Sequence, residues 1–240
     1  MVVPTPNLSA NDARILNALF DPETLPSSVA RSKDASSIDA SLPDHPSMSS
    51  SQLSALEAQQ NDLVREISSS SDFSIIDSAI ERLSEVIEKW PEYPSAYVNR
   101  AMLRRMKLEA LVKESNGSIF DADNNDVEVL FGDLSKAIKV AVASSSPTAP
   151  VSPYQARIMR TAFSHRAYLY LKAAEKDISW KGSGKSELEE MASADFAAAA
   201  KYGDEVAREM SVRTNPYAKM CGAIVRNALA EERKETQSLA

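Results

Sequence analysis

The stretch SAYVNRAM, residues 95–102, decides the fold of this chain, because AFSHRA at residues 162–167 repeats its pattern. In both stretches two alanines stand five positions apart and enclose an aromatic residue. Alanine lets two helix backbones approach closely, and the aromatic side chain fills the gap to the next helix. We therefore expect helix hairpins packed on one another, with these residues in their first helices: Tyr97, Ala101, Phe163 and Ala167.

Two other segments carry the matching residues of the second helices. Ala192, Phe196 and Ala199 are spaced by four and then three, and Ala79 and Leu83 are also four apart. Pro91 follows Ala79 by 12 positions, where it would end the helix and turn the chain into the next hairpin. Helix pairs of this kind stack into a solenoid.

Apolar residues recur at three- and four-residue spacings through most of the chain after residue 51, and no long segment alternates with period two. We therefore expect an all-α protein. The predicted helices cover 52–67, 74–90, 95–113, 127–143, 153–174, 186–202, 204–212 and 215–234.

These spacings resemble the tetratricopeptide repeat, a helix pair of about 34 residues. SAYVNRAM is similar to the first helix of such a repeat, and ASADFAAAAKYG (residues 192–203) to the second. The resemblance implies three repeats, at about 52–91, 94–143 and 153–203, followed by a C-terminal cap at 204–240.

A narrower resemblance covers most of the chain. NDARILNALFDPET (residues 11–24), the repeats, and TNPYAKMCGAIVRNAL (residues 214–229) together resemble the tetratricopeptide repeat protein 36 family. In the last segment Asn215 can cap a helix, Pro216 suits its first position, and Tyr217 follows. We expect the apolar face of this helix to cover the last repeat, with these residues: Met220, Ile224, Val225 and Leu229.

The N-terminal region differs in composition from the repeats. Residues 9–20 predict a short amphipathic helix that packs on the main body or docks on a partner. Residues 21–51 predict a mobile linker, because the stretch 27–51 holds ten serines, Pro43 and Pro46, with few apolar residues.

The composition excludes several classes of function. The net charge of −7 gives no electrostatic reason to bind nucleic acid. A single cysteine excludes an intramolecular disulfide framework. We read no secretory signal and no apolar run that could span a membrane, so we expect a soluble protein of the cytoplasm, with the nucleus as an alternative.

Three features of the sequence resemble parts of known reactive sites. GSGKS at residues 182–186 ends like a phosphate-binding loop, but no strand precedes it and the first glycine of the motif is missing. The calcium-loop likeness at 121–132 lacks the glycine at its sixth position and the glutamate at its twelfth. Cys221 is the one cysteine of the chain and His165 is the one histidine of the predicted repeats, so they give almost no evidence for a catalytic pair. We expect no enzyme activity, cofactor, metal or small-molecule substrate.

The predicted binding site is the groove lined by the first helices. Some members of the wider superfamily grip a terminal carboxylate there, and the corresponding residues here are Glu57, Asn61, Asn99, Thr161 and His165. The cationic positions are lost, so this mode of capture is disfavoured. Asn99 either bonds a peptide backbone or bridges two helices.

Other first-helix residues complete the predicted groove. Arg104, Arg105 and Lys107 form a basic strip that either meets an acidic partner or is a solvated face. We also place Tyr168 in the groove.

The sequence therefore predicts a non-catalytic protein-binding scaffold. The resemblance implies association with an Hsp70-type chaperone and a link to tyrosine metabolism. The alternative is an autoinhibited or purely structural module in which the N-terminal helix packs in the groove.

Overall fold

A computed structural model describes residues 38–68, 73–113, 117–121, 124–142 and 149–238. These residues form α-helices and one short 3-10 helix, and the described part of the chain holds isolated bridges but no strand. The all-α prediction is confirmed, with helix ends mostly within two residues of those expected. The elements are α2 (Ser50–Ser68), α3 (Phe73–Lys89), α4 (Pro94–Lys113), η3 (Ile119–Asp121), α5 (Asn124–Val142), α6 (Pro153–Glu175), α7 (Lys185–Lys201), α8 (Glu205–Thr214) and α9 (Pro216–Ser238).

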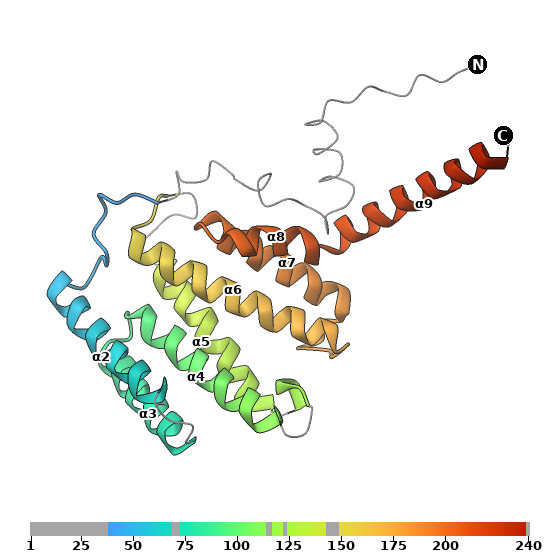
Figure 1. The fold of residues 1–240 in the computed structure, drawn as a ribbon. Helices are drawn as coiled ribbons and strands as arrows, with labels where there is room; N and C mark the ends of the chain where they lie inside the picture. Colours follow the sequence, from blue (N-terminus) through green and yellow to red (C-terminus); the bar gives the residue numbers. More distant parts are fainter. Residues whose placement is uncertain (1–37, 69–72, 114–116, 122–123, 143–148, 239–240) are drawn as a thin grey trace.

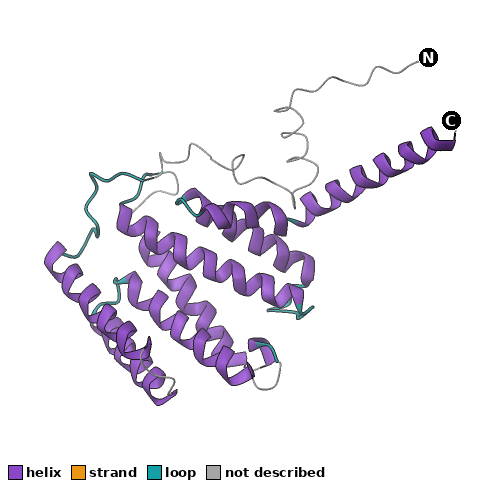
Figure 2. Cartoon of the chain, in the orientation of Figure 1, coloured by secondary structure: helices purple, strands orange, loops and turns teal. Residues whose placement is uncertain are grey.

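The helices pack in the order in which they occur along the chain, each against the next (Figure 1). Figure 2 shows the same arrangement, with the described residues almost entirely in helices and loops. Within this series, α4 packs extensively on α5, and α6 packs extensively on α7. The predicted helix 9–20 lies outside the described residues.

The small residues expected at the helix crossings are buried. Ala79, Ala101, Ala167, Ala192 and Ala199 are all at most 2% exposed. The large residues expected with them are buried or partly buried in the same clusters, and they are Leu83, Tyr97, Phe163 and Phe196. A small residue facing a large one allows the close helix approach on which the hairpins depend.

The loop between α6 and α7 has a structural role. Trp180 stacks on Phe131 of α5 with 5.0 Å between ring centroids and meets Phe120 of η3 edge-on at 5.9 Å. Gly182 has a φ of 85°, a backbone conformation that side chains rarely adopt, and it lets the chain reverse after Trp180. The α7 N-cap is Gly184, whose N–H donates to the Glu187 side chain. The apparent phosphate loop is thus a turn that closes over an aromatic cluster.

The end of the predicted linker is packed on the helices. The Nε2 atom of His45 lies 2.8 Å from the carbonyl oxygen of Glu92, and His45 itself is buried. Asp39 N–H donates to the carbonyl oxygen of Val151, and the Ser152 hydroxyl donates to that of Asp44. Composition alone could not reveal these contacts, because they depend on backbone groups far away in the sequence.

The last helix differs from the cap that the sequence predicts. Asn215 accepts hydrogen bonds from the N–H groups of Tyr217 and Ala218, and Pro216 is the first helical residue. However, α9 projects away from the other helices (Figure 1), so most of its predicted contact face is exposed. Met220, Ile224 and Leu229 are exposed together with Tyr217, whereas Val225 is half-buried.

None of the described helices combines the length and the apolar character that crossing a membrane requires.

Candidate functional site

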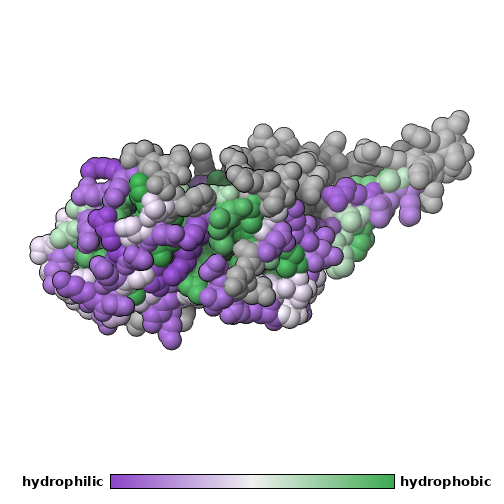
Figure 3. Space-filling view, turned by 90° about the horizontal axis from the view of Figure 1, so that it is seen from below, coloured by the Kyte–Doolittle hydropathy of each residue, from purple (hydrophilic) through white to green (hydrophobic). Residues whose placement is uncertain are grey.

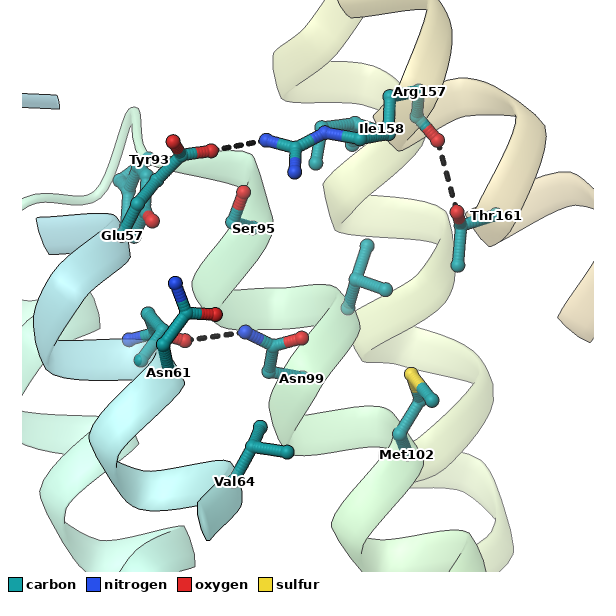
Figure 4. A pocket seen from close by; sticks show the side chains of 12 residues that line it. Glu57, Asn61, Val64, Tyr93, Ser95, Asn99, Met102, Arg157, Ile158 and Thr161 are labelled. Atoms are coloured by element: carbon teal, nitrogen blue, oxygen red, sulfur yellow. Dashed lines mark hydrogen bonds and ion pairs between the residues drawn. The ribbon is translucent and has the colours of Figure 1, made fainter. Parts of the chain in front are cut away.

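One groove runs across the first helices of the three helix pairs, α2, α4 and α6 (Figure 4). Its volume is about 210 Å³. We call it the α2–α4–α6 groove, and its lining residues are Glu57, Gln60, Asn61, Val64, Tyr93, Ser95, Val98, Asn99, Met102, Arg157, Ile158 and Thr161. Asn61, Asn99 and Thr161 were expected there from the sequence, as was Glu57.

One end of the groove is polar. Arg157 of α6 forms an ion pair with Glu57 of α2, so this pair joins the first helix pair to the third. Behind it the hydroxyls of Ser95 and Tyr154 share a hydrogen bond of 2.9 Å. Burial raises the pKa of Tyr93 to about 12. The Ser95 hydroxyl opposes that shift, although its geometric hydrogen-bond partner is Tyr154 and not Tyr93. Tyr93 therefore keeps its proton at neutral pH and can donate it in a hydrogen bond.

Amide side chains occupy the middle of the groove. The Asn99 amide nitrogen donates to the side-chain oxygen of Gln60, so Asn99 bridges α4 to α2. Of the two roles expected for Asn99, the structure therefore shows the bridge. Asn61 directly follows Gln60 on α2 and is exposed (Figure 4).

The other end of the groove is apolar. It continues into a pocket of about 140 Å³ that shares Gln60, Val64, Asn99 and Met102 with the groove and adds Leu63, Ile67, Leu83, Leu103 and Met106. Val64 is 52% exposed and Met106 is 42% exposed. In Figure 3, apolar patches lie between polar side chains on the face seen there. A ligand could therefore meet polar groups and apolar side chains in one continuous site.

The predicted basic strip is divided among internal partners. Arg104 forms an ion pair with the buried carboxylate of Asp133 in α5, so it points away from the groove. Lys107 lies 2.5 Å from Asp77 in α3. A run of basic residues on a helix distributes them around its axis, and the packed helices α3 and α5 supply their counter-charges.

Arg105 belongs to a second cluster on α4 and α6. It donates a hydrogen bond to Nδ1 of His165 at 3.1 Å, and its guanidinium lies 5.4 Å from the ring centroid of Tyr168. Burial, with a smaller contribution from Arg105, lowers the pKa of His165 to about 4. His165 is therefore neutral at pH 7, which agrees with its role as a hydrogen-bond acceptor.

A repeated ion pair was missed in the sequence. Arg100 of α4 makes two hydrogen bonds to Asp133 of α5, at 3.0 and 2.6 Å. Arg166 of α6 does the same to Asp195 of α7, at 2.7 and 2.8 Å. Each arginine also donates to a serine of the preceding helix pair, and these serines are Ser84 and Ser135. The signal was present in the sequence, because an arginine precedes the second alanine in both quoted stretches.

The described residues give no geometric support to the stretches that resemble reactive sites, and Asp123 of the calcium-loop likeness lies outside those residues. No group of three or more His, Cys, Asp or Glu in the described residues could hold a metal ion. Cys221 is exposed on α9, while His165 is committed to Arg105 in α6.

Sequential helix pairs with one groove along their first helices are the architecture of a helical-repeat protein. The chain is 40% identical to the L-tyrosine degradation gene cluster protein hmgX of Aspergillus fumigatus, over 95% of this chain and 94% of that protein. It is 25% identical to tetratricopeptide repeat protein 36 of Xenopus tropicalis, over 93% of this chain and 88% of that protein. The chain belongs to the tetratricopeptide repeat protein 36 family.

No family profile matches the chain, and no solved structure matches it.

Proposed function

We propose that the chain is a non-catalytic scaffold that binds a protein segment in the α2–α4–α6 groove. In this proposal the helix pairs are three tetratricopeptide repeats, at about 52–91, 94–143 and 153–203. The main support for binding is the groove that crosses the first helix of each pair. Its mixture of amide, hydroxyl and apolar side chains suits a peptide better than a small charged metabolite.

The biological setting comes from the relatives. The name of the Aspergillus protein places that protein in an L-tyrosine degradation gene cluster, and we extend this setting to the chain. An Hsp70-type chaperone is the partner that the family resemblance implies. The two ideas are compatible, since a scaffold can bring a chaperone to an enzyme of the same pathway.

A matched pair of substitutions tests the groove. Met106→Arg places a charge at the apolar end of the groove, and Met191→Arg places the same charge on α7, away from the groove. The two methionines are matched in exposure, with Met106 42% exposed and Met191 41% exposed. Full-length chain is immobilised, incubated with lysate of its own organism, and the captured proteins are identified by mass spectrometry. We expect Met106→Arg to abolish capture of a chaperone or a tyrosine-catabolic enzyme and Met191→Arg to retain it. Equal capture by both variants would contradict the use of the groove.

Growth on L-tyrosine as sole carbon source tests the setting. We expect deletion of the gene to slow growth, and the Met191→Arg gene, but not the Met106→Arg gene, to restore it.

Capture that appears only after removal of residues 1–37 would favour the alternative function, an autoinhibited module. The cut belongs after residue 37, because residues 38–49 pack on the helices.

A further inference from the structure

Two buried polar groups in the α2–α4–α6 groove have no hydrogen-bond partner in the described part of the chain. They are the side-chain nitrogen of Gln60 and the hydroxyl of Tyr93. Gln60 is 5% exposed and Tyr93 is fully buried. Buried polar groups in native proteins are nearly always paired, so these two require an explanation.

Their neighbours are already paired with each other. The Gln60 oxygen receives the Asn99 amide, the Ser95 hydroxyl bonds to Tyr154, and Glu57 holds Arg157. The unpaired groups are thus left over after the groove has satisfied its other polar side chains. The comparable buried nitrogens elsewhere in the described residues belong to arginines whose side chains make other polar contacts. Arg105 Nε lies 3.4 Å from a Glu109 oxygen, and the Arg208 guanidinium donates a hydrogen bond to the Ala200 carbonyl oxygen. The unpaired Gln60 and Tyr93 groups therefore mark one place in the molecule.

That place adjoins the apolar pocket. Gln60 lines both the groove and the pocket, and Val64 and Met102 form the boundary between them. An amide donor beside an apolar pocket matches a peptide residue, whose carbonyl oxygen and side chain lie next to each other.

The charged residues at the groove favour an internal segment of a partner protein over its C-terminal end. A C-terminal carboxylate requires a free cation, but Arg157 is paired with Glu57 and the other positions used for such capture hold Thr161 and His165. Glu57 would also repel a carboxylate at the polar end. A neutral peptide backbone meets no such penalty.

We propose that the groove binds an internal, extended peptide segment by one large apolar residue. The side chain of that residue enters the apolar pocket at the end of the groove, and its carbonyl oxygen accepts a hydrogen bond from the Gln60 amide. A second acceptor oxygen of the segment accepts a hydrogen bond from the Tyr93 hydroxyl. This inference rests on the proposed function, that the groove binds a protein segment.

Selection from two random 12-residue peptide libraries tests it with the full-length chain. One library presents the random residues between constant flanks, and the other presents them at a free C-terminus. We expect enrichment from the internal library, with one large apolar residue common to the selected sequences. Enrichment from the C-terminal library alone, or from neither, would overturn the proposal. Enrichment only with a chain that lacks residues 1–37 would assign the groove to the chain's own N-terminal segment and would also overturn it.

Tyr93→Phe and Tyr97→Phe form the matched pair for the binding measurement. Each removes one hydroxyl, but the Tyr97 hydroxyl donates to the Pro91 carbonyl oxygen and does not line the groove. We expect Tyr93→Phe to weaken binding of a selected peptide about five- to tenfold by fluorescence anisotropy without lowering Tm. Tyr97→Phe should keep the affinity and lower Tm by about 2–4 °C. A fall in Tm for Tyr93→Phe with unchanged affinity would show that its hydroxyl serves the fold alone.

The double variant Gln60→Leu with Asn99→Leu removes the Gln60 amide donor. It also removes the Asn99 amide, which would lose its acceptor if Gln60 alone were replaced. We expect it to remain folded and to bind the peptide at least tenfold more weakly. Capture of a partner that Met106→Arg abolishes, combined with full capture by Tyr93→Phe and by the double variant, would overturn this inference and leave the proposed function standing.

Discussion

Asp133 neutralises two guanidinium groups at once, and this makes it the most demanding residue of the polar interior. Its side chain is 6% exposed and forms ion pairs with Arg100 and Arg104. Removing the carboxylate would leave two positive charges in a partly buried site without a counter-charge. The repeated use of this arrangement at Arg166 and Asp195 indicates that it fixes the first helix of a pair against the second.

We therefore predict that Asp133→Ala lowers the free energy of unfolding by about 3–5 kcal/mol. Asp62 is the control, because its ion pair with Arg65 is on the surface and Asp62→Ala should change stability by less than about 1 kcal/mol. Urea unfolding followed by circular dichroism measures both. Similar values for the two variants would show that the buried pair carries no special weight.

His165 gives the fold a specific pH dependence. Its pKa is lowered to about 4 in the folded chain, first by burial and then by Arg105, from 6.5 as the ordinary value. Between these values the unfolded chain binds more protons than the folded chain, so stability is complete above pH 6.5 and decreases as the pH falls towards 4.

From pH 7.5 to pH 5 this histidine alone should cost about 2 kcal/mol of unfolding free energy. The measurement is urea unfolding at several pH values, for the native chain and for His165→Asn. We expect the variant to show a flatter dependence above pH 5, where most carboxylates remain ionised. An identical slope for the two chains would mean that His165 titrates normally.

At the scale of the elements, sequence periodicity gave the helices and their ends because those features are local. Pro153 and Pro216 begin helices, and a Ser152 cap with Gln155 fixes the start of α6. The path of α9 could not be found in this way. A stripe of apolar residues shows that a helix is amphipathic, but it does not show whether another element lies against that stripe.

The candidate site was only partly predictable for the same reason. Asn61 and Asn99 were found from their place in the repeats, whereas Arg157 and Tyr93 enter the groove from neighbouring turns. Arg104 was placed in the groove because its charge was visible in the sequence, but its partner, Asp133, lies on another helix. Pairing across helices is a tertiary property, and single-helix spacing does not contain it.

The exposed face of α9 leads to a prediction about that element. Ile224 is 60% exposed, whereas Phe196 of α7 is buried. We expect Ile224→Ala to change the unfolding free energy by less than about 0.5 kcal/mol and Phe196→Ala to lower it by about 3–5 kcal/mol. Thermal and urea unfolding compare the two variants. A large loss for Ile224→Ala would indicate that this face of α9 is covered in solution.

At the scale of the whole molecule, an ion pair and a loop among the described residues connect the first helix pair to the third. One is the ion pair between Glu57 and Arg157 across the groove. The other is the 38–49 loop, where His45 lies against the Glu92 carbonyl oxygen and the Asp44 carbonyl oxygen accepts from Ser152. Repeat arrays usually have contacts only between adjacent repeats, so these connections limit the relative motion of the pairs and hold the groove at one width.

The loop should contribute more to this than the ion pair. The ion pair is largely exposed and is worth about 0–1 kcal/mol, whereas the loop buries His45 and makes several hydrogen bonds worth about 1 kcal/mol each. We predict that a chain starting at residue 50 is about 2–4 kcal/mol less stable than one starting at residue 38. The m-value should also fall, because the first helix pair would unfold separately from the rest. Urea unfolding of the two truncated chains measures both quantities, and His45→Ala in the full-length chain should reproduce part of the loss. Equal stability and equal m-values for the two truncated chains would show that the groove keeps its width without the loop.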